Sequence, residues 1–124
     1  MDARAGIGRR GEEAAAAHLT GLGWRILDRN WRSGRLGELD IVAVEPTAGQ
    51  GHLVFCEVKT RSGLGYGGPL EAVTHAKLSR LRRLAMAWLA AHGRRADTVR
   101  IDAIGVLWPP GGAPAIDHRR GVTL

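Results

Sequence analysis

Two short segments in the middle of the chain, residues 38–45 and 52–60, consist mostly of Val, Ile, Leu, Ala and Phe. Runs of this length and composition predict largely buried β-strands. The residues between them, 47–51, include two glycines and a threonine, which predicts a hairpin. Both strands are therefore expected in a β-sheet whose faces the rest of the chain must cover.

Helical patterns on either side of these strands can supply that cover. Residues 7–21 carry Ala and Leu at helical spacing, and residues 69–92 carry an apolar stripe that ends before Gly93. Further strands are expected over residues 24–31 and 98–108, with a short one at 115–117. This order predicts an α/β fold with a mixed central sheet flanked by helices.

Side-chain direction can be predicted for the strand 24–31. Alternate residues of a strand share a face, so Trp24, Ile26 and Asp28 are expected on one side and Leu27 on the other.

Length and composition limit the class of protein. A chain of 124 residues suits a single domain, residues 1–124, of which 109–124 form a tail. The single cysteine, Cys56, excludes a disulfide framework and a Cys-rich zinc site. No apolar run approaches the roughly 20 residues of a membrane span, and no signal-peptide pattern is present. The expected compartment is the cytoplasm, without membrane association.

The chain is basic, with 18 Lys+Arg against 12 Asp+Glu and a formal net charge of +6. Only Lys59 and Lys77 are lysines, and the remaining cations are arginines. Guanidinium groups match phosphate geometry, so this excess suits a polyanionic partner. Arginine-favouring codon usage better explains the bias toward arginine as a whole, and solubility can explain the net charge, so charge alone does not identify a nucleic-acid-binding protein.

Acidic residues interrupt the two apolar strands. Residues two apart share a face, which places Glu38 with Asp40 and Glu57 with Lys59. Buried carboxylates are costly unless they are paired or bind a metal. A carboxylate pair beside a lysine suits Mg²⁺, whose other ligands are often water and substrate phosphate. A structural ion-pair network is the alternative interpretation.

The motifs around these residues resemble a known family. Asp40, sixteen residues and then Glu57-Val58-Lys59 have the spacing of PD-(D/E)XK nucleases. The YraN-like family of small bacterial proteins is similar over the segments Gly8–Glu12, Gly37–Ala43, Phe55–Arg61, Gly67–Pro69, Lys77 and Arg100–Asp102. The resemblance covers nearly the whole chain and is weakest in the tail.

The resemblance implies a restriction-endonuclease-like αβββαβ core, distantly similar to that of archaeal Holliday junction resolvases. It implies a metal-dependent endonuclease that hydrolyses phosphodiester bonds in DNA, with structure-specific cutting of branched or junction DNA as the expectation. Mg²⁺ is the implied cofactor, with Mn²⁺ as a substitute. A homodimer is compatible with the resemblance but is not established by this sequence.

The family motif also implies roles for individual residues. Asp40 and Glu57 would hold the metal, Glu12 would reach it directly or through water, and Lys59 would orient or activate the attacking water. Either Glu12 or Glu13 could be the helical carboxylate, although the Gly-Glu match and the helical phase favour Glu12. The residue before Asp40 is leucine, which departs from the proline of the general nuclease pattern.

Several other residues are candidates for supporting roles. Glu38, Thr60 and Lys77 would lie beside the site, and Arg32, Arg35 and Arg61 would contact phosphates. Solvated surface positions are the alternative for each of them. Trp31 is the candidate for stacking on an unpaired base, and no role is assigned to the histidines. The remaining tryptophans, Trp24, Trp88 and Trp108, are expected in the core, and Asp102 is expected to pair with a helix arginine.

The alternative function is a nucleic-acid-binding module that has a nuclease fold and little or no activity. A protein-interaction scaffold is a third candidate, although no motif supports it.

Overall fold

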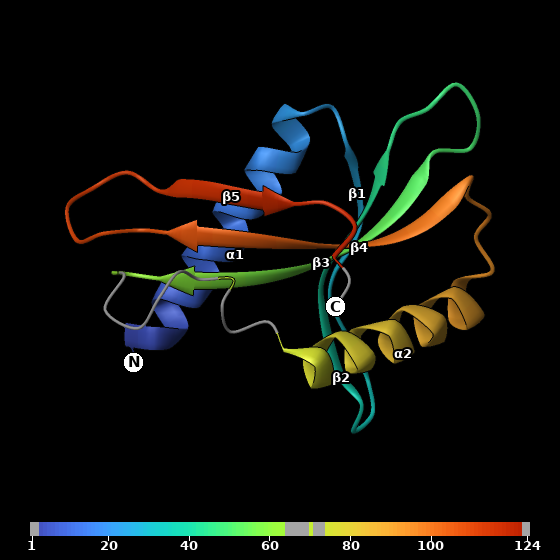
Figure 1. Ribbon diagram of the computed structural model, residues 1–124, viewed down its shortest axis with the longest axis horizontal. Helices are drawn as coiled ribbons and strands as arrows, with labels where there is room; N and C mark the ends of the chain where they lie inside the picture. The colour runs from blue at the N-terminus through green and yellow to red at the C-terminus, as the bar shows by residue number, and fades with distance from the viewer. Residues whose placement is uncertain (1–2, 64–69, 71–73, 123–124) are drawn as a thin grey trace.

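A computed structural model describes residues 3–63, 70 and 74–122 of the chain (Figure 1). Its elements are α1 (Ala3–Gly21), β1 (Arg25–Ser33), β2 (Gly37–Glu45), β3 (His52–Arg61), α2 (His75–His92), β4 (Thr98–Leu107) and β5 (Ala115–Arg119). The expected order of helix, three strands, helix and strand is confirmed. The short strand expected at 115–117 is present and extends to Arg119.

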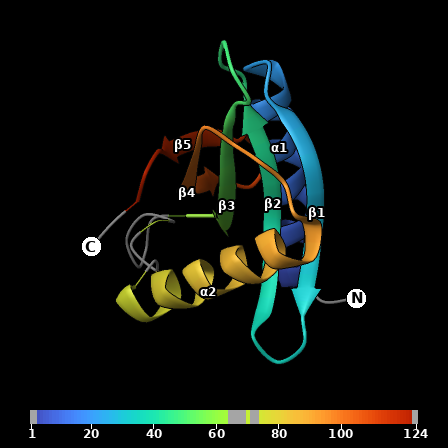
Figure 2. The same cartoon turned by 90° about the vertical axis from the view of Figure 1, so that its right-hand side faces the viewer.

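The five strands form one mixed sheet in the order β1-β2-β3-β4-β5. Strands β3 and β4 are parallel and the other pairs are antiparallel, so α2 makes the crossover connection from β3 to β4. Figure 2 shows α1 on one face of the sheet and α2 on the other. Neither helix is long and apolar enough, within the described residues, to cross a membrane.

Each helix covers its own hydrophobic core. Leu19 of α1 packs in a cluster with Val54 and Cys56 of β3, whereas Trp88 of α2 packs in a cluster with Leu53 and Phe55 of the same strand. The alternation along β3 explains this division, because successive side chains point to opposite faces. The central strands are therefore buried on both sides, as their apolar composition predicts.

The start of α2 differs from the sequence expectation. Thr74 has an extended backbone (φ −98°, ψ 168°) and its Oγ1 accepts a hydrogen bond from Lys77 N, so the helix begins at His75. Residues 69 and 71–73, where the helix was expected to begin, lie outside the described residues. The expected stop is confirmed, because Gly93 adopts the left-handed conformation and its N–H donates to Leu89 O.

A bulge in β1 overturns the prediction for Asp28. The pairing with β2 shifts between Ile26 and Asp28, so one extra residue reverses the alternation of side chains. Ile26 therefore packs in the α1 cluster, as expected, but Asp28 faces α2. There its Oδ2 accepts a hydrogen bond from Trp88 Nε1 at 3.0 Å.

A glycine allows α1 to lie directly on β3. A Cβ atom on Gly11 would lie 1.8 Å from Thr60 Oγ1, whereas a Cβ on Gly8, one turn earlier, would meet nothing within 4 Å. Thr60, expected beside the candidate site, is thus on the α1 face of β3, and Gly11 fixes the height of the helix above it.

Gly11→Ala is expected to lower the free energy of unfolding by about 1–3 kcal/mol, because the added methyl group overpacks the contact with Thr60. Urea unfolding measures the change. Gly8→Ala is the matched control, and it should stabilise the helix by up to about 1 kcal/mol through helix propensity. Thr60→Ala should restore part of the loss in the Gly11 variant. Equal stability of the two alanine variants would contradict this packing.

Candidate functional site

The candidate site lies where β2 and β3 separate. Their paired residues run from Glu45↔His52 to Ile41↔Cys56, whereas β3 stays paired with β4 as far as Arg61↔Leu107. Beyond Ile41, the Oδ2 atom of Asp40 accepts a hydrogen bond from Val58 N at 2.8 Å. A side-chain carboxylate thus replaces a strand carbonyl as the acceptor, and Asp40 is held between the two strands.

Glu57 and Lys59 lie on β3 at the same point. Only 5% of Glu57 is exposed, and its Oε1 lies 3.1 Å from Lys59 Nζ. The lysine side chain is 25% exposed and therefore reaches solvent while it is paired. The expected face shared by Glu57 and Lys59 is thus observed as a partly buried ion pair.

The site holds more negative charge than its lysine neutralises. Burial and the nearby Glu57 carboxylate raise the pKa of Asp40 from 3.8 to about 7, and Glu12 adds to the increase. The Val58 N–H and the Lys59 ammonium act in the opposite direction but do not restore the ordinary value. Carboxylates that repel one another in a buried place are stabilised by a cation.

The helical carboxylate beside the site is Glu12. Its pKa is raised, first by burial and then by Glu38, and it contributes to the raised pKa of Asp40. Glu13 instead forms an ion pair with Arg29 (Oε1 to Nη2, 2.9 Å), and its side chain is 70% exposed. The structure therefore places Glu12 toward the site and Glu13 toward solvent, as the helical phase predicts.

Asn30 joins two of these carboxylates, and nothing in the residue pattern marks it. It is the one non-glycine residue with a positive φ (53°) in the described part of the chain. With its amide nitrogen turned toward the carboxylates, Asn30 donates to Glu38 Oε1 (2.9 Å) and Glu12 Oε2 (3.1 Å). Asn tolerates this backbone conformation better than most residues, so the strand can bend here and direct the amide to the site.

The remaining candidate residues are distributed unevenly. The first cause of the lowered pKa of Lys77 is the charge of Lys59, so α2 brings its lysine toward the site. Lys59 and Arg61 line a cavity of about 340 Å³ together with Glu12. Arg32 pairs with Glu38 (3.3 Å) on the exposed surface. Arg35 is exposed in the turn between β1 and β2.

The donor set suits one kind of metal better than others. Among the described residues, no three His, Cys, Asp or Glu side chains form a ready-made metal centre. Mg²⁺ needs no such centre, since one or two carboxylates with water and substrate phosphate complete its octahedral shell. Asp40 and Glu57, two repelling carboxylates beside a cavity, fit that type of ligand set.

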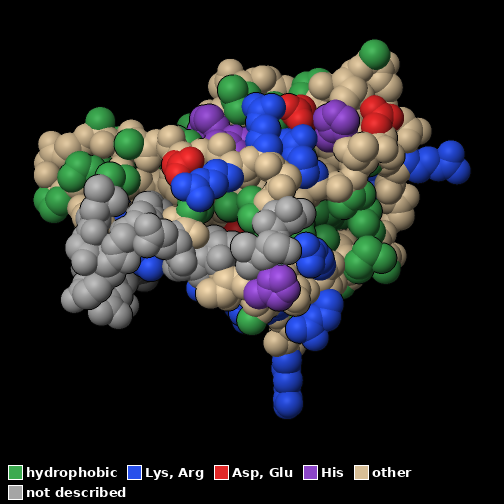
Figure 3. Space-filling view, in the orientation of Figure 1, with side chains coloured by type: hydrophobic (Ala, Val, Ile, Leu, Met, Phe, Trp, Pro, Cys, Tyr) green, Lys and Arg blue, Asp and Glu red, His purple; other side chains and the backbone are tan. Residues whose placement is uncertain are grey.

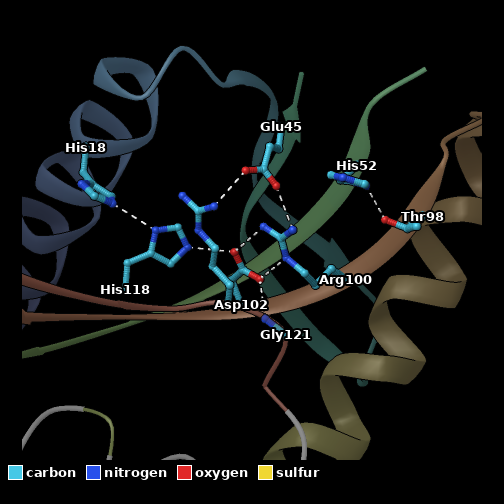
Figure 4. A network of polar contacts seen from close by, with 9 residues as sticks. His18, Glu45, His52, Thr98, Arg100, Asp102, His118 and Gly121 are labelled. Carbon is cyan, nitrogen blue, oxygen red and sulfur yellow. Dashed lines mark hydrogen bonds and ion pairs between the residues drawn. The ribbon is translucent and has the colours of Figure 1, made fainter. Parts of the chain in front are cut away.

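A second acidic centre has a different character (Figure 4). Asp102 is fully buried and accepts hydrogen bonds from Arg100 Nε (2.7 Å) and Gly121 N (3.0 Å), while His118 Nε2 lies 2.8 Å from its Oδ2. Burial alone would raise the pKa of Asp102, but the bonds from His118 and Arg100 hold it below the ordinary value. The prediction that Asp102 pairs with a helix arginine is therefore wrong, because its arginine partner, Arg100, lies on the same strand, β4.

His118 extends this network to α1, since its Nδ1 lies 3.0 Å from His18 Nε2. Arg100 also contacts Glu45 at 2.8 Å. Both carboxylate oxygens of Asp102 accept hydrogen bonds from neighbouring donors. The network therefore links α1, β2, β4 and β5 as a structural unit.

Asp40→Asn is expected to stabilise the free protein by roughly 2 kcal/mol at pH 8, because the amide keeps the acceptor for Val58 N and removes a costly charge. The folded pKa is raised, so the wild-type carboxyl group stabilises the fold below pH 3.8 and loses that contribution as the pH rises through about 7. The difference between variant and wild type should therefore grow from pH 4 to 7 and then level off.

Urea unfolding at several pH values measures this difference. Millimolar Mg²⁺ should then raise the melting temperature of the wild type above pH 7 and leave Asp40→Asn unchanged. A pH-independent difference would contradict the electrostatic account.

Comparison with known proteins identifies the family. The model of uncharacterised protein family UPF0102 matches residues 11–106. A UPF0102 protein of Clavibacter michiganensis is 57% identical over 111 residues, which cover 90% of each chain. A UPF0102 protein of Streptomyces coelicolor is 52% identical over 98% of this chain and 92% of the relative. The chain therefore belongs to the UPF0102 family, which confirms the similarity of its motifs to the YraN-like proteins.

Proposed function

We propose that this chain is a metal-dependent endonuclease that hydrolyses phosphodiester bonds in DNA. The observation that carries the proposal is the meeting of Asp40, Glu57 and Lys59 where β2 and β3 separate. Burial and mutual repulsion raise the pKa of Asp40 to about 7, which is costly for a purely structural group. The contrast with Asp102, whose charge is fully matched by donors, supports a functional role for the unmatched site.

The residues of the site divide the chemistry. Mg²⁺, or Mn²⁺ in its place, held by Asp40 and Glu57, would polarise a phosphoryl oxygen and acidify bound water. Glu12 adds negative charge that strengthens cation binding from the α1 side. Lys59 orients the attacking water with its ammonium group and offsets the charge that develops on the phosphate. Its pairing with Glu57 keeps that ammonium group in place.

The positive charges beside the site favour a substrate that is recognised by its shape rather than by its base sequence. Arg61 lines the cavity at the site, and Lys77 lies close enough for its pKa to respond to Lys59. Contacts of this kind bind phosphates without reading bases. We therefore expect branched or junction DNA in the cytoplasm as the substrate.

One observation favours the alternative of a binding module with little activity. The formal net charge of +6 supports binding to a polyanion without requiring catalysis. Such a module would bind DNA, lose affinity steeply with salt and cut nothing.

A substrate panel separates the two functions. Junction, flap, single-stranded and duplex DNA are incubated with the wild type in Mg²⁺, Mn²⁺ or EDTA. The proposal predicts cutting of branched DNA with either metal and none in EDTA. Salt-dependent binding without cutting under any condition would establish the alternative instead.

A further inference from the structure

A second cavity, of about 470 Å³, lies next to the candidate site. Ser62 lines both this cavity and the smaller cavity that Glu12 and Lys59 line. The other lining residues come from α1 and from the β4–β5 connection: Arg10, Trp108, Pro109, Pro110, Gly111 and Gly112. Figure 1 shows the start of α1, the end of β3 and this connection on the same side of the molecule. Figure 3 shows hydrophobic side chains gathered there.

An arginine–tryptophan pair forms part of the cavity wall. The guanidinium carbon of Arg10 lies 4.2 Å from the centre of the Trp108 ring, within the range of a cation–π contact. The Trp108 Nε1 atom donates to Gly112 O at 2.9 Å, so the loop fixes the direction of the ring. Trp108 is only half-buried, although it also touches the α1 core. The pair is thus partly exposed and positively charged.

The sequence suggests Trp31, rather than Trp108, as the tryptophan that stacks on an unpaired base. Trp31 packs in the α2 cluster and meets His92 edge-on, with 6.0 Å between ring centres. Trp108, expected in the core, packs against the edge of the α1 cluster and also lines the cavity. Trp108 lies one residue past the end of β4, where Arg10 of α1 contacts its ring and the side chain stays partly exposed.

The lining chemistry matches a nucleobase. Bases stack on aromatic rings and on guanidinium planes, and the arginine charge favours a ligand with a phosphate beside the base. The volume lies within the range of small-molecule sites, about 300–1,000 Å³. A paired base is stacked within its duplex, so only an unpaired base can enter.

We propose that this cavity binds an unpaired nucleotide of the DNA strand next to the bond that is cut. The inference rests on the proposed nuclease function and adds its substrate class: DNA with a single-stranded segment at the cleavage point. Stacking on the Arg10–Trp108 pair selects flaps, overhangs and open junctions over continuous duplex.

Fluorescence anisotropy tests this selection, with Ca²⁺ in place of Mg²⁺ to prevent cutting. The probes are a labelled duplex, the same duplex with a four-nucleotide overhang, and an overhang in which abasic sites replace the bases. The wild type should bind the natural overhang about ten-fold more tightly than the duplex, and the abasic overhang no more tightly than the duplex. Trp108→Leu and Arg10→Ala should each remove this preference while changing duplex affinity less than three-fold.

Arg119→Ala is the matched control, since it removes one exposed arginine from β5. It should weaken all three probes equally and keep the preference for the overhang. Circular dichroism shows whether Trp108→Leu is folded, and Arg10→Ala tests the same pair without altering the core. An unchanged preference in both variants, or tight binding of the abasic overhang by the wild type, would overturn the inference.

Failure of this inference differs from failure of the nuclease proposal. If the wild type cuts DNA but Trp108→Leu and Arg10→Ala both keep the preference for the overhang, the pocket is wrong and the nuclease stands. If the preference depends on Arg10 and Trp108 but no DNA is cut with Mg²⁺ or Mn²⁺, the pocket stands and the nuclease is wrong.

Discussion

Replacing Glu57 with Gln is expected to lower the single-turnover rate of DNA cleavage by about a thousand-fold. The substitution keeps the size of a side chain that is only 5% exposed, but removes the charge that pairs with Lys59 and that would hold the proposed metal. Loss of about 4 kcal/mol of transition-state stabilisation corresponds to this factor. DNA affinity should change little, because in the proposed complex the surrounding cations would make the phosphate contacts.

Quenched-flow or gel-based cleavage under enzyme excess measures the rate. Glu13→Gln is the matched control, because Glu13 follows Glu12 directly in α1 but its side chain points to solvent. Its rate should stay within about two-fold of the wild type. Equal losses in both variants would mean that charge near α1, rather than the position of Glu57, determines the rate.

Asp102→Ala is expected to be the most destabilising single substitution in the polar interior, at about 3–5 kcal/mol. It leaves Arg100, His118 and Gly121 N without the acceptor that they share in a fully buried place. Removing one partner of a buried charged network costs this much because the other charges stay buried and unmatched. Asp102→Asn should cost less, since it keeps one acceptor.

Chemical denaturation gives the free energy of unfolding for these variants. Asp117→Ala is the control, because Asp117 pairs with Arg119 at 3.2 Å on the exposed surface of β5. Such a pair contributes 1 kcal/mol or less. If Asp102→Ala and Asp117→Ala are equally stable, the network does not hold β4, β5 and α1 together.

Hydrophobic spacing was sufficient to predict the elements and the two-sided burial of β3. The pairing of Glu57 with Lys59 follows from strand alternation alone, and the position of Glu12 follows from helical phase. These are local properties, which depend only on the spacing of residues along one element.

Features that depend on contacts between elements could not be predicted. The bulge before Asp28 depends on how β1 pairs with β2. The contact between His118 and Asp102 joins residues of two different strands, β5 and β4, and the residue pattern of either strand alone does not predict it. Asn30 gains its importance from a backbone conformation that many other residues would strain to adopt. The start of α2 depends on the cap at Thr74, where a periodic pattern alone suggests an earlier start.

The most direct test of the central claim is the rate at which one labelled flap DNA is cut by the wild type and by Asp40→Asn, measured as a function of Mn²⁺ concentration. If Asp40 holds the metal, the wild-type rate should rise with Mn²⁺ and saturate, no cutting should occur in EDTA, and the variant should be about a thousand-fold slower at every concentration. Equal cutting by both proteins, or a wild type that binds the flap and never cuts it, would contradict the assignment of this site as a metal-dependent nuclease centre.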